Sequence, residues 1–133
     1  MKKMLVLVVL FVLASCASPV DEVEVPDPDN PFVGTWEQRG TNPNGEYYNI
    51  LKFTNTHFSY KATSSGNEFS GPYTYTETTI TFDPDEGIDE EDKDIVPWTT
   101  NYLINDNRSA VWFETKMTIR GTTYVIGGTY TKE

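Results

Sequence analysis

The chain alternates apolar and polar residues in short runs from Val33 onward. Aromatic and β-branched residues recur at every second position, and Gly, Asn, Pro, Ser or Thr interrupts them at short intervals. Successive side chains of a strand point to opposite faces, so this period of two predicts antiparallel strands with one buried face. No window shows the period of an amphipathic helix. Eight strands are expected, at residues 33–38, 46–53, 57–62, 68–75, 79–82, 98–104, 109–119 and 123–132.

The short connections between these strands favour an up-and-down meander. Most of the expected turns span two to five residues, as at 54–56, 76–78, 105–107 and 120–121. A meander of eight strands removes its exposed edges by closing into a barrel, so an all-β, eight-stranded antiparallel barrel is predicted. A two-layer sandwich is the alternative, but only the acidic loop after Phe82 is long enough for a crossing connection. Gly71-Pro72 would interrupt the pairing of its strand and predicts a bulge.

Alternation also assigns an inner and an outer face to each strand. On the seventh strand, Trp112, Glu114, Lys116 and Thr118 are expected to face outward. The inner face is expected to hold Leu51, Phe53, Phe58, Tyr60, Phe69, Tyr73, Tyr75, Ile80, Phe82, Trp98, Tyr102, Ile104, Val111, Phe113, Met117, Ile119, Tyr124, Ile126 and Tyr130.

The N-terminus has the pattern of an export signal. Lys2 and Lys3 precede an apolar run at residues 4–14, which is shorter than the roughly 20 residues that cross a bilayer as a helix. The sequence Leu13-Ala14-Ser15-Cys16 resembles the lipobox of bacterial lipoproteins, in which the cysteine is acylated and becomes the first residue of the mature protein. This resemblance implies a signal peptide at 1–15 and lipid attachment at Cys16. Since Cys16 is the single cysteine of the chain, no intramolecular disulfide can form.

An acidic, proline-rich segment separates the cysteine from the strands. It is poor in apolar residues, so we expect residues 16–31 to form an extended, disordered tether; an edge strand at 23–26 is the alternative. The expected domain is therefore the barrel at 32–133. Acylation predicts a cell-envelope location. Ala17, which follows the cysteine in place of the Asp that retains some lipoproteins in the inner membrane, favours the outer membrane but does not settle the face.

Net charge narrows the class of partner. The chain has 10 Lys and Arg against 20 Asp and Glu, a net charge of −10, and removal of Lys2 and Lys3 with the signal leaves −12. Such a surface repels nucleic acid and anionic lipid headgroups. We therefore expect no nucleic-acid partner, and contact with the membrane through the acyl chains alone.

The start of the domain resembles the lipocalin superfamily. Pro31-Phe32-Val33-Gly34-Thr35-Trp36 is similar to the Gly-x-Trp opening of lipocalins and of lipocalin-like domains in bacterial lipoproteins, and 127–132 is similar to their last strand. The resemblance implies that Trp36 closes one end of the barrel beneath a cation from the last strand. This chain offers Lys132 where the family usually has Arg.

Residues for catalysis are scarce. His57 is the one histidine and is expected to lie wet beside a turn, so neither a zinc site nor a Ser–His–Asp triad can be assembled in ordinary form. The acids at 83–94 crowd one loop without EF-hand spacing; such runs are usually solvated, and calcium binding there is left open. We expect no enzyme, no cofactor and no resident metal.

Aromatic residues are the feature of the sequence that favours a binding function. All three Trp, all eight Tyr and six of the seven Phe lie between Phe32 and Glu133. They either fill a small barrel completely or line a pocket whose ligand or water satisfies the tyrosine hydroxyls. The first hypothesis is a lipid-anchored lipocalin-like barrel that binds a small apolar or amphipathic molecule. The alternative is a filled barrel that acts as an interaction protein, an inhibitor or adhesin, through its loops and Trp112. The expected ligand-binding residues are Trp36, Phe53, Phe58, Tyr60, Tyr73, Tyr75, Trp98, Tyr102, Phe113 and Tyr124.

Overall fold

A computed structural model of the chain describes residues 24–115, 117–119, 122–124 and 126–133. The expected signal peptide and Cys16 lie outside these residues. The strands are β1 (Gly34–Asn42), β2 (Gly45–Phe53), β3 (His57–Ala62), β4 (Glu68–Tyr75), β5 (Thr79–Phe82), β6 (Trp98–Ile104), β7 (Ala110–Phe113), β8 (Met117–Ile119), β9 (Thr122–Tyr124) and β10 (Gly128–Lys132).

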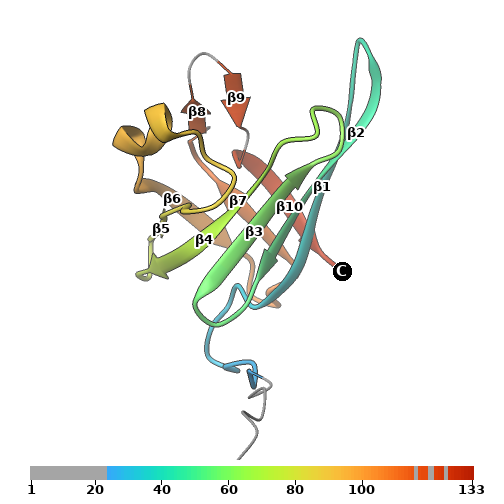
Figure 1. Cartoon of the computed structure of the whole chain (residues 1–133). Coiled ribbons are helices and arrows are strands. Elements are labelled where there is room, and N and C mark those ends of the chain that lie inside the picture. Colours follow the sequence, from blue (N-terminus) through green and yellow to red (C-terminus); the bar gives the residue numbers. More distant parts are fainter. Residues whose placement is uncertain (1–23, 116, 120–121, 125) are drawn as a thin grey trace, which may run out of the picture.

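Eight of these strands close into an antiparallel barrel, in the order β1-β10-β7-β6-β5-β4-β3-β2 (Figure 1). Closure is made by β1 and β10, which pair at Trp36 with Lys132 and at Glu37 with Thr131. The first strand therefore meets the last, and every barrel strand has two neighbours. The predicted all-β, up-and-down, eight-stranded barrel is confirmed.

The two remaining strands correct the expected seventh and eighth strands. The sequence predicts one strand at 109–119 and one at 123–132. Instead, β7 ends at Phe113, and β8 pairs with β9 as a separate two-stranded sheet. Only β10, the second part of the expected eighth strand, joins the barrel. The chain leaves the barrel where the backbone N–H of Thr115 donates to Thr100 Oγ1, at 3.0 Å, in place of a strand carbonyl. Met117, Ile119 and Tyr124 therefore do not belong to the barrel wall. A hairpin has the same period of two as the wall, so alternation could not reveal the break.

The first hairpin is longer than expected. Residues 39–42 continue β1, and their ladder with β2 extends to Asn42 paired with Gly45, so the turn is only Pro43-Asn44. Gly45 has a φ of 122°, a conformation that side-chain-bearing residues rarely adopt. The hairpin projects beyond the rest of the barrel (Figure 1).

The expected bulge at Gly71-Pro72 is absent. Pairing of β4 with β3 runs unbroken from Glu68 to Pro72, and β4 then pairs with β5 from Tyr73. Gly71 is needed for another reason: a Cβ there would lie 2.7 Å from Pro84 Cα, in the segment that crosses over β4.

The acidic loop is partly fixed to the barrel. The backbone N–H groups of Asp85 and Glu86 both donate to the Ser70 carbonyl, and Ser70 N–H donates to Glu86. Farther along, Glu90–Ile95 forms a short 3₁₀ helix, η1, which the sequence pattern did not predict. Local backbone hydrogen bonds thus order a run whose charges alone indicate solvation.

Candidate functional site

Most of the residues expected to bind a ligand come together inside the barrel, where they pack among other aromatic side chains. Of the ten, Trp36, Phe53, Phe58, Tyr60, Tyr73, Tyr102 and Phe113 are at most 6 % exposed. Trp98 is half-buried and stacks on Phe82 with 5.3 Å between ring centroids, whereas Tyr75 is 39 % exposed at the rim. The tenth residue, Tyr124, lies in β9 outside the wall, and its side chain is outside the described part.

Protein groups satisfy two of the tyrosine hydroxyls that had suggested a pocket. Tyr73 Oη donates to the Thr54 carbonyl at 2.8 Å and accepts from Asn30 Nδ2 at 2.7 Å. Tyr102 Oη donates to the Thr76 carbonyl at 2.8 Å. Burial raises the pKa of Tyr73 to about 12, against the smaller lowering by Asn30, and also raises the pKa of Tyr102. These hydroxyls therefore stay protonated donors at neutral pH and need neither water nor a ligand.

The segment before β1 closes the end of the barrel at which these tyrosines lie. Phe32 is fully buried, and its ring lies 4.8–6.2 Å, between centroids, from the rings of Phe53, Tyr73, Tyr75 and Tyr102. Asn30 is 6 % exposed and accepts from the Phe32 N–H at 3.0 Å.

Farther upstream the same segment bonds to the turn between β2 and β3. Asn55 Oδ1 accepts from the Asp27 N–H at 2.7 Å, and Asn55 Nδ2 donates to the Val25 carbonyl at 2.8 Å. Residues 24–31, expected to belong to the tether, are thus bonded to the barrel. No strand includes residues 24–26, the described part of the alternative edge strand.

Trp36 and Lys132 form a unit across the closure of the barrel. Trp36 is fully buried, and its Nε1–H donates to the Phe32 carbonyl at 2.6 Å. Lys132 Nζ lies 5.2 Å from the Trp36 ring centroid, within range of a cation–π contact. Gly34 makes room for the lysine, because a Cβ there would lie 2.8 Å from Lys132 Cε, and its φ of 133° also favours glycine. The Gly-x-Trp spacing therefore has a packing reason in this chain.

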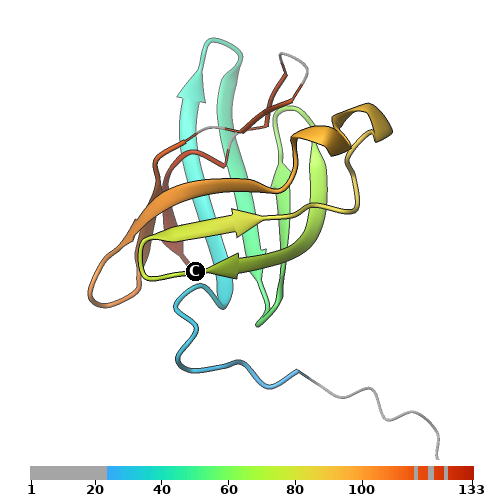
Figure 2. The ribbon, with the colours of Figure 1, turned by 90° about the vertical axis from the view of Figure 1, so that its left-hand side faces the viewer.

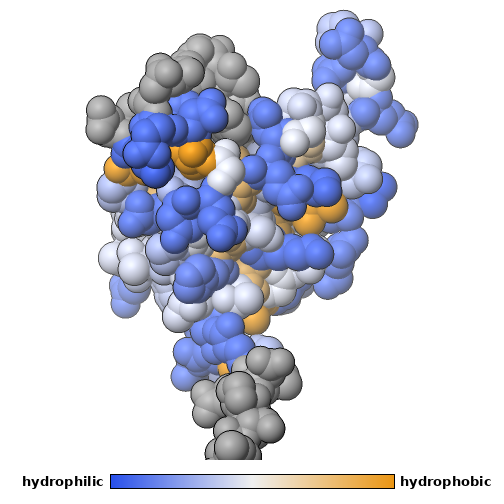
Figure 3. All heavy atoms as spheres, viewed as in Figure 1, coloured by the Kyte–Doolittle hydropathy of each residue, from blue (hydrophilic) through white to orange (hydrophobic). Residues whose placement is uncertain are grey.

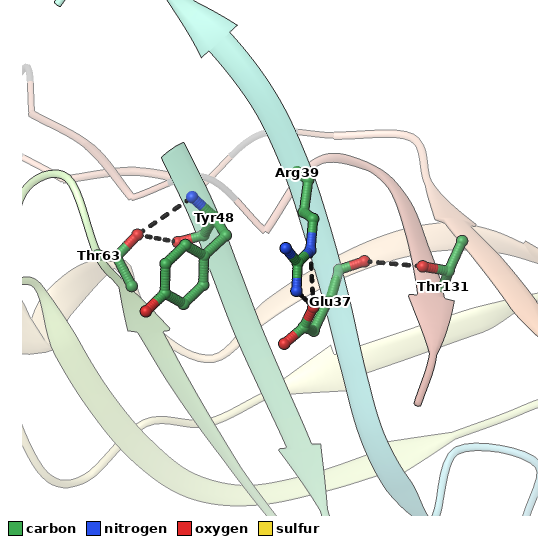
Figure 4. Close-up of polar contacts among 5 residues, drawn as sticks. All are labelled: Glu37, Arg39, Tyr48, Thr63 and Thr131. Carbon is green, nitrogen blue, oxygen red and sulfur yellow. Dashed lines mark hydrogen bonds and ion pairs between the residues drawn. The ribbon is translucent and has the colours of Figure 1, made fainter. Parts of the chain in front are cut away.

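The outer wall divides into two halves of different charge. Outward positions of β1 to β4 carry charged residues, including Glu37 with Arg39, whose ion pair measures 2.6 Å, and Lys61 with Glu68, at 3.4 Å. Figure 3 shows hydrophilic residues gathered over this side of the barrel. Figure 4 shows its border, where Thr131 Oγ1 on β10 donates to the Glu37 carbonyl on β1 at 3.4 Å.

The outward positions of the other half of the wall carry no charge; Lys132 at the end of β10 and Glu114 after β7 are the charged residues next to them. Alternation and register place nine residues outward on β5, β6, β7 and β10, and none of these described residues is charged: Thr79, Thr81, Thr99, Asn101, Leu103, Ala110, Trp112, Thr129 and Thr131. We call this surface the neutral face; Figure 2 looks towards β5 and β6. Glu114, just after β7, borders it and accepts from Asn101 Nδ2 at 2.6 Å.

Trp112 lies near the middle of the neutral face. It pairs with Leu103 on β6 and with Thr129 on β10, and it is 38 % exposed, while Leu103 is 68 % exposed. Alternation along the strand predicts Trp112 outward, as observed. The neutral face is not visible in the sequence, because the four strands that form it are separated along the chain and only their register brings these residues together.

The outside of the wall carries grooves, one of which contains the histidine His57. The groove between β2, β3 and β4 has a volume of about 430 Å³ and is lined by residues including Lys52, His57, Asp85 and Glu86. His57 is exposed, and its Nδ1 lies 2.8 Å from Thr56 Oγ1, a hydroxyl and not a carboxylate. Among the described residues, no three His, Cys, Asp or Glu side chains are grouped as metal ligands.

Within the described part of the chain, no helix has the length and apolar character needed to span a membrane. Comparison with protein-family models, with curated proteins and with solved structures finds no match to this chain.

Proposed function

We propose that this chain is a lipid-anchored, non-enzymatic interaction protein of the cell envelope, whose filled barrel is a scaffold and whose neutral face binds the partner. The observation that carries the proposal is the neutral face itself. In a chain of net charge −10, the nine outward positions of four strands carry no charge, and the exposed Trp112 lies among them. Exposed aromatic residues among uncharged neighbours are more typical of a surface that binds a partner than of a surface that only contacts solvent.

The packing of the barrel interior supports this choice over the small-ligand function. That function rested on tyrosine hydroxyls in need of a partner, and Tyr73 and Tyr102 have protein partners. The closed barrel and the contact between Trp36 and Lys132 support the resemblance to lipocalins, which we retain as a proposal about origin. Binding of a small apolar molecule inside the barrel is the alternative.

The proposed anchor is compatible with an exposed neutral face. Seven residues separate Cys16 from Glu24, so they reach at most about 25 Å. The segment at 24–31 then meets the end of the barrel that carries the turn between β2 and β3. The barrel wall is therefore free to face a partner above the membrane surface.

Fluorine NMR distinguishes the two functions, because the three tryptophans report on different places. Trp36 and Trp98 project into the barrel, whereas Trp112 lies on the neutral face. The full chain is labelled with 5-fluorotryptophan, held in detergent and titrated with solubilised cell-envelope material. We expect the Trp112 resonance to shift or broaden while that of Trp36 stays. Movement of Trp36 and Trp98 with an unchanged Trp112 would contradict the proposal and favour a ligand inside the barrel.

A further inference from the structure

We propose that the partner of the neutral face is an uncharged polysaccharide, with one sugar ring stacked on Trp112. This inference rests on the proposed function and names the chemical class of the partner. Three properties of the face support it: the exposed aromatic side chain, the hydrogen-bonding groups on the same strands and the lack of outward cations.

The aromatic surface comes from a cross-strand pair. Leu103 and Trp112 are directly opposite each other on β6 and β7, and both are exposed. The face of an aromatic ring is electron-rich, whereas the axial C–H groups of a sugar ring form a weakly positive, apolar patch of similar size. A pyranose stacked on the exposed part of Trp112, beside Leu103, would match both surfaces.

Hydrogen-bonding groups surround this pair. Thr129 lies beside Trp112 on β10, and Thr99 and Asn101 precede Leu103 on β6, all of them exposed. The Asn101 amide is held by Glu114, at 2.6 Å, and Thr99 Oγ1 lies 2.8 Å from Thr81 Oγ1. Hydroxyl and amide groups donate and accept, as sugar hydroxyls do, so a neutral glycan can pair its hydroxyls across the face.

The lack of outward cations disfavours the other classes of polymer. Nucleic acid and anionic polysaccharides need cations, which the outward positions of these strands lack, and the net charge of −10 repels them. A stable protein interface usually has a larger apolar centre than the two side chains of Leu103 and Trp112. A neutral, hydroxyl-rich polymer requires neither.

The test uses the full chain in detergent and follows tryptophan fluorescence during titration with three neutral polysaccharides, dextran, mannan and xylan, and with alginate as the anionic control. At least one neutral polymer is expected to change the emission in a saturable way, and alginate is not. Trp112→Leu keeps an apolar side chain but removes the ring, and is expected to weaken binding by about tenfold. Trp112→Phe keeps a ring and is expected to retain most of the affinity. Because these variants remove a reporter, their affinities are measured by retardation in gels that contain the polymer.

Tyr48→Ala is the matched control, because Tyr48 is 43 % exposed but lies on the charged half of the wall. It is expected to bind as the wild type does. Three results would overturn the inference. The first is equal affinity of the wild type and Trp112→Leu for the neutral polymers, and the second is a loss of affinity in Tyr48→Ala as large as that in Trp112→Leu. The third is stronger binding of alginate than of the neutral polymers. Failure of all three neutral polymers, with the Trp112 fluorine resonance still responding to envelope material, would overturn the polysaccharide and leave the neutral face as a binding surface. A concentration-dependent dimer that Trp112→Leu dissociates would assign the face to a second copy of the chain instead.

Discussion

Replacement of Phe32 by alanine tests whether the segment before β1 closes the barrel. The Phe32 side chain is fully buried, and its ring contacts four other aromatic rings. Truncating a buried phenylalanine typically costs about 3–5 kcal/mol, from the lost transfer of apolar surface and the remaining cavity. Since a domain of this size is stabilised by about 5–15 kcal/mol, the variant loses a large share of its stability. The corresponding decrease in melting temperature is about 12 °C or more.

Urea unfolding of the wild type and Phe32→Ala, followed by near-ultraviolet circular dichroism, measures this loss. Val25→Ala is the control in the same segment: Val25 is 79 % exposed, so its truncation is expected to change stability by less than about 0.5 kcal/mol. A Phe32→Ala variant as stable as Val25→Ala would refute the closure of the barrel by this segment. It would also refute our interpretation that the protein itself satisfies the hydroxyls of Tyr73 and Tyr102.

Three further predictions concern the closure of the barrel, its tyrosines and the anchor. Gly34→Ala should destabilise the barrel by about 1–3 kcal/mol in the same urea assay, because the new Cβ meets Lys132 at a positive φ; unchanged stability would contradict the packing reason for Gly-x-Trp. The unfolding free energy should fall as the pH rises from about 10 towards 12, because folding raises the pKa of Tyr73 from 10.0 to about 12, so in this range its hydroxyl ionises more readily in the unfolded state than in the folded state. Tyr73→Phe should reduce this fall, and a flat profile in the wild type would count against the burial of the hydroxyl. Cys16→Ala should leave an uncleaved or unlipidated precursor, whose intact mass lacks the acyl chains; a variant of the same processed and acylated mass as the wild type would refute acylation at this cysteine.

The period of two was sufficient to predict the barrel, because an inward side chain at every second position leaves few arrangements for eight short strands. It placed Phe53 and Phe113 inside and Trp112 outside, as observed. The branch after Phe113 could not be predicted, because Met117 and Ile119 continue the same alternation in a separate hairpin. The burial of Asn30 could not be predicted either, because its hydrogen-bond partners Tyr73 and Asn55 are distant in sequence.

The candidate site shows the same limit of sequence reasoning. Aromatic composition indicated where side chains gather but not whether they leave space for a ligand, because that depends on the partners of each hydroxyl. The Asn30 amide that binds Tyr73 comes from a segment whose prolines and charges predict a tether. The neutral face depends on the register of four strands, which places Trp112 between Leu103 and Thr129. No local motif encodes that arrangement.

Native mass spectrometry of the mature protein, purified from cell envelopes in mild detergent, tests most directly whether the barrel is a filled scaffold. We predict a mass equal to that of the acylated polypeptide, with no small molecule retained at one equivalent once the detergent is removed in the gas phase. A stoichiometric apolar ligand that persists in the wild type and is lost when Phe58 or Phe113, both inside the barrel, is replaced by alanine would contradict the account.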